Sequence, residues 1–448
     1  MTNISQEFLD RIYELSQKKM QDKDLEQAKK CFSDYIAVAM GGMKSQKEKM
    51  FAYIQQEKGK YSIIGCSEKV PLNNAILINA YNAHVLELDD GHRYAMMHLA
   101  APIFSSLISV GENMNASMHE IFNSAIIGYE AAVRLAGAIQ PQHKKQGFHA
   151  TGTCGTVGCT LAIAVLLKYS REEMMNAMCA AATSAAGLLE AIMGQSQQKP
   201  YNVANAAVSG MNAAMFGRYF SGPSDVLGGD RGFLRNFSNE VNEKYLLRDN
   251  DDMLINGIYM KPYAACRHCH APIEAAIKLN NDNHIKLGEI KDIIIETYGL
   301  AVYGHDHRNS ENSNAAKMSI PYSVAVALIY KSAGMDMFTE NMIQDSLVNG
   351  LMNKIQVREK KELSAQVPHK RSAIITVVYG DGTSESVKVD YPKGEPENPM
   401  EYDEILKKYM GLMKYSGKSE EMAIRVWNLI WKEESVKIGE ILDNVNKQ

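Results

Sequence analysis

The chain has 448 residues, of which 46% are hydrophobic and 22% are charged, and its formal net charge is -4. A chain of this length and apolar content can bury a large core and predicts two or more domains. The charge balance does not favour nucleic-acid binding, because nucleic-acid binders usually concentrate Lys and Arg on one face. A small anionic substrate needs only a local pocket of positive charge.

The start of the chain and its cysteines give a prediction about location. No basic segment followed by an apolar run opens the chain, and no apolar run of about eighteen residues occurs later. Seven cysteines are scattered along the chain, and this odd count fits a reducing compartment better than a disulfide framework. We therefore expect a cytoplasmic protein that does not associate with a membrane.

The first part of the chain has a helical pattern. Up to about residue 258, apolar residues recur at three-and-four spacing, which is typical of amphipathic helices. The clearest patterns cover residues 8–19, 25–40, 72–88, 103–114 and 119–139. Residues 172–220 are rich in Ala, Met, Ser and Gly, which predicts closely packed helices at the centre of the core. We interpret the 26 methionines as core filler.

The character of the sequence changes after residue 259. Residues 290–298 and 373–379 carry β-branched runs, residues 383–391 alternate, and Asp-Gly at 381–382 predicts a hairpin. Helical patterns lie between these strands, near residues 313–332 and 339–353. The Pro-rich segment 392–399 predicts a linker, after which helices resume.

These patterns predict a mainly α protein with an inserted domain. Residues 1–258 are expected to form the first part of a large all-helical domain. Residues 259–395 are expected to form a smaller α+β lid domain, and residues 396–448 to return to the helical domain.

The first segment that could carry chemistry is HVLELDDGH at residues 84–92, followed by His98. Three acidic residues and three histidines fall within fifteen positions at the end of a helical pattern. A solvated helix end would explain such a cluster equally well. The alternative is that Gly91 ends the helix and lets Asp89, Asp90 and His92 face a cleft.

Two further segments suggest anion binding. Residues 147–158 (GFHATGTCGTVG) are interpreted as a Gly/Thr-rich loop feeding a helix that begins near Cys159, where free backbone N–H groups favour an anion. His149 at its entrance could hold a carboxylate or move a proton. A capped helix with a structural loop is the simpler alternative. In residues 194–200, Lys199 precedes a proline between small-residue helices and could also point at an anion.

Residues 261–270 (KPYAACRHCH) contain a C-x-x-C-H pattern that is shared by haem attachment sites and is half of a zinc site. Haem c attachment requires export, and structural zinc usually takes four ligands, so we interpret both matches as coincidence. Tyr322, in residues 317–322 (KMSIPY), could donate a proton or orient a carboxylate, or it could be a core tyrosine with a satisfied hydroxyl.

The order of these motifs and the residues in them resemble those of the MmgE/PrpD family over nearly the whole chain. The matching elements are His-x-Leu-(Asp/Glu)-x-Asp-Asp at 84–90, Gly-Phe-His-x-Thr-x-x-x-Gly at 147–155, Lys-Pro at 199–200, Lys-Pro-Tyr-x-x-Cys-x-x-x-His at 261–270, Ser-x-x-Tyr at 319–322 and Pro-x-Gly-(Asp/Glu)-Pro-x-Asn-Pro at 392–399. Several motifs in the right order are more specific than any one of them.

The resemblance implies a helical domain, an inserted lid, an active site between them and a homodimer. By position, the catalytic residues that it implies are Asp89, Asp90, His98, His149, Lys199, Lys261, His270 and Tyr322. The substrate-binding residues that it implies are Glu87, His92, Thr151 and Cys266. The sequence departs from the family at Gly91-His92 and at Leu99, which touch the pocket expected to choose the substrate.

The function that the resemblance implies is a cofactor-independent lyase of small di- or tricarboxylic acids, most simply a hydro-lyase like 2-methylcitrate dehydratase. In our hypothesis, Lys199, Lys261 and His149 hold the substrate carboxylates. His98 or one of the paired aspartates takes the proton next to a carboxylate, and Tyr322 or His270 supplies a proton. No metal ligand set is predicted.

Three alternatives remain open from the sequence. The same site could serve an epimerase of an iminodisuccinate-like substrate or a cis-aconitate-type decarboxylase. A zinc-binding protein would use the ligands Cys266, His268, Cys269 and His270 with His92 or His98. The third alternative is a non-catalytic helical scaffold.

Overall fold

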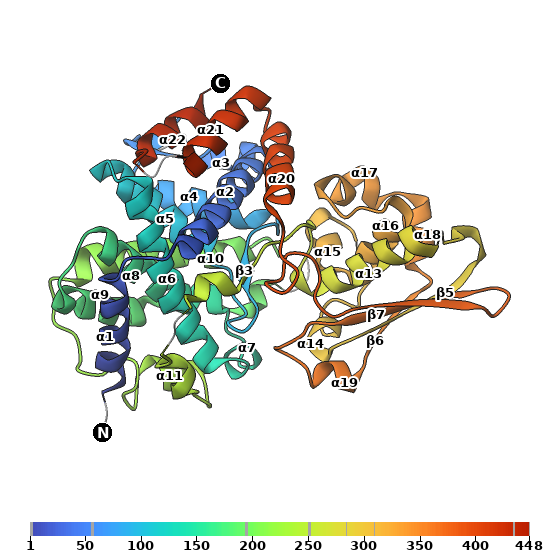
Figure 1. Ribbon diagram of the computed structural model, residues 1–448, viewed down its shortest axis with the longest axis horizontal. Helices are drawn as coiled ribbons and strands as arrows, with labels where there is room; N and C mark the ends of the chain where they lie inside the picture. Colours follow the sequence, from blue (N-terminus) through green and yellow to red (C-terminus); the bar gives the residue numbers. More distant parts are fainter. Residues whose placement is uncertain are drawn as a thin grey trace. The chain divides into compact units, whose positions relative to one another are not determined.

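The structure is a computed structural model that describes residues 3–54, 58–192, 196–249, 252–283, 285–308, 310–432 and 435–447. The chain divides into two compact units, one made of Met1–Ala191, Gln198–Ile258 and Glu401–Gln448, the other mainly of Tyr259–Met400. Helices dominate the elements (Figure 1), so the predicted mainly α class is confirmed. Among the described residues, no helix is long and apolar enough to cross a membrane.

The first unit is almost entirely helical. Its helices are α1 (Ile4–Ser16), α2 (Asp22–Ser45), α3 (Lys47–Ile54), α4 (Leu72–Val85), α5 (Ala100–Met114), α6 (Met118–Ile139), α7 (Gln142–Lys145), α8 (Ala150–Leu166), α9 (Arg171–Ser184), α10 (Lys199–Asn212), α11 (Phe233–Phe237), α12 (Glu243–Leu246), α20 (Tyr402–Tyr415), α21 (Glu420–Lys432) and α22 (Ile438–Asn446). Its short strands include β1 (Tyr61–Ser62), β2 (Lys69–Val70) and β3 (Gly91–His92), and a π-helical turn η2 (Ala213–Gly217) follows α10. The C-terminal helices return to this unit, where α20 packs on α2 (Figure 1).

Helices α6 and α8 cross at the centre of the first unit. A Cβ added at Gly158 of α8 would lie 2.7 Å from the Ala132 Cβ and 2.8 Å from the Gly128 carbonyl oxygen on α6. Both glycines are therefore required for the close approach of the two helices. Helix α10 packs against α8 and α4, which places the start of α10 beside the end of α4 in the core.

The prediction that residues 172–220 form the centre of the core is only partly right. Ala177, Met178 and Ala181 of α9 are buried, and so are the small residues of α10. The described residues between these helices, 185–192 and 196–198, are exposed or partly exposed. The turn after α10 is also exposed, with the Phe216 and Phe220 side chains 69% and 57% exposed. Small-residue composition could not distinguish a packed helix face from an exposed one.

The second unit combines helices with a four-stranded sheet. Its elements are α13 (Arg267–Asn283), β5 (Ile290–Thr297), α14 (Gly299–Val302), α15 (Ser313–Met318), α16 (Ile320–Tyr330), α17 (Glu340–Ile343), α18 (Ser346–Met352), β6 (Ile355–Glu359), α19 (Lys361–Ser364), β7 (Ala373–Tyr379) and β8 (Ser384–Val389). The strand order is β6-β5-β7-β8. Strand β6 pairs parallel to β5, whereas β7 pairs antiparallel to both β5 and β8. The β7–β8 pair is the predicted hairpin. The sequence did not predict β6.

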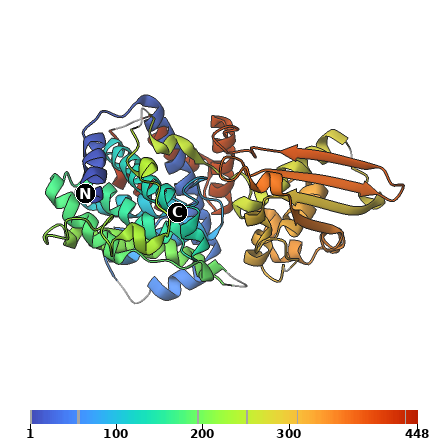
Figure 2. The same ribbon diagram turned by 90° about the horizontal axis from the view of Figure 1, so that it is seen from below.

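The sheet buries one face under helices. Alternate residues of β7 are buried, among them Ile375 and Val377, and α13 packs on β7 and β8. Figure 2 shows the helices of this unit on one side of the sheet. The period-two burial explains why the β-branched runs were recognisable in the sequence.

The predicted linker at residues 392–399 is wrong. Glu395 is only 1% exposed, and Met260 donates its backbone N–H to the Gly394 carbonyl at 3.0 Å. Gly394 has a φ of +92° and a Cβ there would fall 1.8 Å from the Met260 carbonyl oxygen. The turn-forming composition reflects a tight packed turn, because Pro and Gly serve that purpose as well as they serve a linker.

Candidate active site

A sharp turn after α4 carries the acidic residues of the first motif. The helix ends at Val85, and Glu87 adopts a left-handed conformation with a φ of 57°. The prediction that Gly91 ends the helix is wrong, since Gly91 lies in β3. The Lys408 ammonium of α20 donates to the Leu88 carbonyl at 2.7 Å and pairs with Asp34 at 2.5 Å. A distant lysine therefore supports the turn.

Asp90 is anchored to the start of α5. Its carboxylate accepts the backbone N–H groups of Leu99 and Ala100 at 3.1 and 2.9 Å and the Tyr129 hydroxyl at 2.8 Å. Burial raises the pKa of Asp90 to about 7, helped by the charge of Asp89, although these hydrogen bonds act in the opposite direction. With its oxygens committed in this way, Asp90 is a positioning group.

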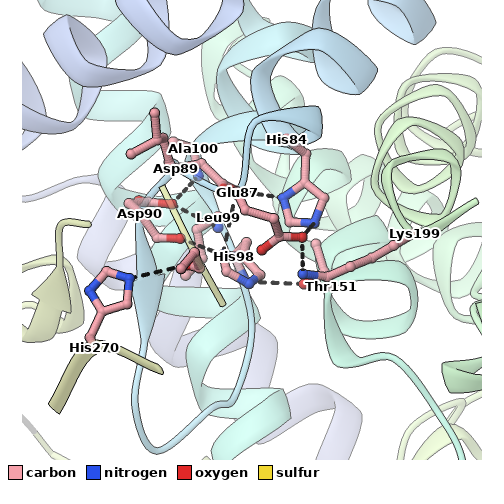
Figure 3. A network of polar contacts seen from close by, with 12 residues as sticks. His84, Glu87, Asp89, Asp90, His98, Leu99, Ala100, Thr151, Lys199 and His270 are labelled. Atoms are coloured by element: carbon pink, nitrogen blue, oxygen red, sulfur yellow. Dashed lines mark hydrogen bonds and ion pairs between the residues drawn. The ribbon is translucent and has the colours of Figure 1, made fainter. Parts of the chain in front are cut away.

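Asp89 connects two imidazole rings (Figure 3). Its Oδ2 lies 2.7 Å from the His84 Nδ1 and 3.4 Å from the His98 Nδ1, and the two rings are 4.8 Å apart. The His98 Nδ1 is also 2.6 Å from the Asp90 backbone carbonyl. A carbonyl only accepts, so this nitrogen carries the hydrogen, and Nε2 is the nitrogen that can accept a proton.

Lys199 is paired within the first unit. It is the first residue of α10, and its ammonium forms an ion pair with the Glu87 carboxylate. Both side chains are mostly buried, and Glu87 also lies 4.0 Å from the His84 Nε2. The lysine predicted to face an anion thus already has a carboxylate partner, which a substrate carboxylate would have to share or displace.

The predicted Gly/Thr-rich loop is a helix. Helix α8 begins at Ala150, directly after His149, and runs through the whole GT-rich segment. Burial lowers the pKa of His149 well below its usual value, and the Lys199 charge lowers it further. This direction favours a neutral ring, which would bind a carboxylate through a hydrogen bond, and the predicted role of His149 stays a prediction. Thr151 on the first turn accepts the His98 backbone N–H at 3.0 Å and so positions His98.

His92 lies outside the Asp89 cluster. The Ala95 backbone N–H donates to its Nδ1 at 3.1 Å, and its own N–H donates to the Met97 carbonyl at 2.9 Å. These bonds shape the 92–97 turn that leads to His98. The structure therefore gives His92 an architectural position.

In the second unit, His270 is held at both ring nitrogens. The Arg267 guanidinium donates to its Nδ1 at 2.9 Å, so its Nε2 carries the hydrogen and donates to the Ala265 carbonyl at 3.1 Å. Arg267 in turn pairs with Glu395 at 2.7 Å and lies over the Tyr259 ring at 4.4 Å. This network joins two of the motifs through packing.

The other predicted residues of the second unit are also buried or partly buried. The Tyr322 hydroxyl donates to the Met337 carbonyl at 2.8 Å, as expected for the alternative of a core tyrosine. Lys261 is 0% exposed. The Cys266 thiol is partly exposed and lies 3.3 Å from the His305 Nε2.

The alternative zinc set does not assemble in the described part of the chain. His270 uses both nitrogens, and the Cys269 thiol faces the Lys317 carbonyl at 3.9 Å. Within the described ranges, the group of three potential ligands whose atoms all lie within 4.8 Å of one another is His84, Asp89 and His98. Their spacing is that of hydrogen bonds, and the His98 nitrogen involved carries a hydrogen, so these donors do not fit a metal ion as they stand.

Sequence reasoning missed the side chains that position this cluster. Tyr129 is 39 positions from the Asp90 carboxylate that it bonds, and Lys408 is 320 positions from the Leu88 carbonyl that it bonds. Neither stands in one of the motifs that the sequence singled out. A buried tyrosine or lysine in a helical pattern gives no local signal of such a partner.

The fold and the cluster define a mainly α-helical protein with a buried carboxylate–imidazole site. Family models for the MmgE/PrpD N-terminal domain and C-terminal domain match residues 6–245 and 263–433. The chain belongs to the MmgE/PrpD family, which confirms the resemblance read from the motifs.

Two curated relatives from fungi match nearly the whole chain. A cis-aconitate decarboxylase of Aspergillus terreus is 25% identical over 420 residues, covering 87% of this chain and 84% of that protein. A cis-aconitate decarboxylase-like protein of Aspergillus oryzae is 25% identical over 470 residues, covering 98% and 96%.

Proposed function

We propose that this protein is a lyase of small di- or tricarboxylic acids that needs no cofactor. The single observation that carries the proposal is the Asp89–His98 arrangement in the first unit. The His98 Nδ1 donates a hydrogen bond to the Asp90 carbonyl, and the His98 ring lies beside the Asp89 carboxylate. Family membership and the names of the two relatives support the same class of reaction and substrate.

In the proposed reaction, the His98 Nε2 takes the proton from the carbon next to a substrate carboxylate. The Asp89 carboxylate stabilises the imidazolium that forms, because an opposite charge at this distance favours the charged ring. The carbon–oxygen bond then breaks as the alkene forms. The hydroxyl leaves as water with a proton supplied by the His98 imidazolium or by a predicted donor, Tyr322 or His270. Balance therefore requires no oxidant, reductant or metal.

The substrate carboxylates need cationic partners, and Lys199 is the one proposed in the first unit. Its pairing with Glu87 orients the ammonium before substrate arrives. Neutral His149 would contribute a hydrogen bond to the same carboxylate. Lys261 stays a predicted carboxylate partner, and Thr151, Glu87, His92 and Cys266 stay predicted pocket residues.

Proton donation by Tyr322 or His270 is less well supported. Inside the second unit, the Tyr322 hydroxyl already donates to a backbone carbonyl, and the two His270 nitrogens already bond a guanidinium and a backbone carbonyl. A donor role would require one of these bonds to break first. The expectation of a site shared by both units stays a prediction.

A decarboxylase is the second candidate, favoured by the names of the relatives. In that reaction the bond between the carboxylate carbon and its neighbouring carbon breaks, and CO₂ leaves. The electron pair stays on the neighbouring carbon, which then takes a proton. Protonated His98 would then act as the acid, so the same residues serve with the proton moving in the opposite direction. An iminodisuccinate-type epimerase would need a base and an acid on opposite faces.

Proton NMR with a panel of 2-methylcitrate, citrate, cis-aconitate and iminodisuccinate precursors tests the proposal. Loss of water from one compound supports the dehydratase, and release of CO₂ supports the decarboxylase. Lys199→Ala should abolish the conversion, whereas Lys145→Ala, at an exposed position of α7, should not. Conversion that survives Lys199→Ala unchanged would exclude this site.

We also propose a homodimer that forms through the end of α10 and the turn after it. Large apolar side chains are exposed along this stretch, with the Phe216 and Phe220 rings 4.8 Å apart. Exposed apolar clusters of this kind often mark protein interfaces. Light scattering should give a dimer for the wild type and a monomer for the Phe216→Glu/Phe220→Glu variant. Leu347→Glu, at an exposed leucine of α18, is the matched control.

A further inference from the structure

A cysteine and a histidine that no motif links lie side by side in the second unit. The Cys266 Sγ is 3.3 Å from the His305 Nε2, although 39 positions separate the two residues. Cys266 is the partly exposed cysteine of the chain, whereas the other six are buried, and all seven lie within the described residues. Exposure and a nearby base are the two conditions for a reactive thiol.

The tautomer of His305 suits it to accept the thiol proton. Its Nδ1 lies 3.0 Å from the Tyr303 carbonyl, and because a carbonyl only accepts, Nδ1 carries the hydrogen. The Nε2 that faces the thiol is then an acceptor. The Cys266 thiol, the His305 imidazole as its base and the Tyr303 carbonyl that orients the imidazole therefore lie in a chain, each within hydrogen-bond reach of the next.

Backbone hydrogen bonds hold Cys266 and His305 in place. Cys266 donates its backbone N–H to the Lys317 carbonyl, and the His305 carbonyl accepts the Ile320 N–H, both at 2.9 Å. Gly304, with a φ of +80°, turns the chain into His305. The junction of α15 and α16 therefore fixes both segments through backbone bonds.

Cys266 also stands immediately before α13, a helix of 17 residues. Its carbonyl accepts the Cys269 N–H at 2.8 Å, so it occupies the start of the helix. The positive end of the helix dipole stabilises a thiolate at such a position. This effect and the imidazole act in the same direction.

Other ionisable groups face the thiol–imidazole pair formed by Cys266 and His305. The His268 ring is 4.9 Å from the His305 ring, and its Nδ1 bonds the Tyr298 hydroxyl at 2.6 Å. Burial raises the pKa of Tyr298, and the nearby Arg371 and Arg267 charges oppose that shift. The Glu395 carboxylate also acts on Tyr298, where the two arginine charges oppose it.

We propose that Cys266 is a nucleophilic thiol, activated by His305, that adds to electron-poor alkenes, which are soft electrophiles. In this addition the thiol proton passes to the His305 Nε2, and the sulfur bonds to the β-carbon of the alkene. The π bond breaks, and the α-carbon takes up the proton from the imidazolium. The site is a modification site, and the labelling that tests it requires no turnover of a lyase substrate.

Labelling with N-ethylmaleimide, located by peptide mass mapping of the folded full chain, tests the proposal. At pH 7 Cys266 should react first and the buried Cys269, three positions away, should stay unlabelled. Cys266→Ser should abolish rapid labelling, whereas Cys269→Ser should leave it unchanged. Labelling of Cys266 no faster than of the buried cysteines would overturn the proposal.

The role of His305 has its own test. His305→Gln should slow labelling about tenfold at pH 7, because an ordinary thiol with a pKa near 8.5 is only a few per cent thiolate there. Its rate should rise with pH up to that value. If this variant fails to fold, the wild-type pH profile decides, since activation requires half-maximal labelling below about pH 8.5. An unperturbed profile, or an unchanged rate in His305→Gln, would contradict activation.

Discussion

Two histidine-bearing segments, residues 84–98 and residues 261–270, look equally functional in the sequence and differ in the structure. In the first, the His98 Nδ1 is held by a carbonyl beside the Asp89 carboxylate, which sets Nε2 up as a base. In the second, both nitrogens of His270 are engaged by Arg267 and Ala265, and Arg267 is paired with Glu395. Similar motifs therefore surround a histidine with one ring nitrogen able to accept a proton in the first segment, and one with both nitrogens engaged in the second.

The largest effect on turnover should come from Asp89→Asn. The substitution keeps the size of the side chain but removes the charge that stabilises a protonated His98, so kcat should fall about 10²- to 10⁴-fold, as for loss of general acid–base assistance. Steady-state kinetics on the compound that the NMR panel identifies as the substrate would measure it. Asp90→Asn, next in the chain, should cost much less, because Asp90 bonds the start of α5. Equal losses in the two variants would remove the distinction between them.

The second segment should instead respond in stability. Arg267→Met leaves the Glu395 carboxylate buried without its partner, and such losses cost about 3–5 kcal/mol. Urea denaturation of the full chain would measure this. The double variant Arg267→Met/Glu395→Met removes both charges and should recover part of the loss. A single variant as stable as the wild type would contradict an architectural role for this segment.

Asp90 should give the first unit a characteristic pH dependence. Its folded pKa of about 7 lies above the usual value of 3.8 for an aspartate, so the folded state holds the proton more tightly than the unfolded state. This contribution is present at acidic pH and is lost as pH rises towards 7, by up to about 1.4 kcal/mol per pH unit. Urea midpoints at several pH values should show that Asp90→Asn removes this slope. An unchanged slope would mean that Asp90 ionises normally.

The smallest expected effect concerns the crossing of α6 and α8 beneath the cluster. In Gly158→Ala the new methyl group would meet the Ala132 Cβ at 2.7 Å, and overpacking of this kind costs about 1–3 kcal/mol. Gly155→Ala on the same helix is the matched control, since its nearest neighbour would lie 3.8 Å away. That variant should keep or slightly raise the melting temperature. Similar losses in both variants would argue against a close-contact role.

The sequence was sufficient for the elements with strong periodicity. Strands β5, β7 and β8 were recognisable from β-branched runs and from the Asp-Gly turn. Strand β6 was not, because its five residues are mostly polar and only partly buried. Helix α8 was partly mistaken for a loop, because Gly and Thr are poor helix formers and the close crossing with α6 overrides that preference.

The members of the candidate site were easier to name than their roles. Charge and imidazole content within one segment indicated His98 and Asp89. The state of His149 could not be predicted, because burial and the nearness of Lys199 depend on tertiary packing. The same limit hid the Cys266–His305 contact, since His305 stands in a turn without a recognisable motif.

Deuterium incorporation in D₂O, followed by proton NMR, tests the central claim most directly. On the identified substrate, the wild type should place deuterium on a carbon next to a carboxylate, in recovered substrate or in product. His98→Asn should slow this incorporation at least about 100-fold, whereas His92→Asn, which keeps an acceptor for the Ala95 N–H, should lose far less. Incorporation at the wild-type rate in His98→Asn would contradict the account.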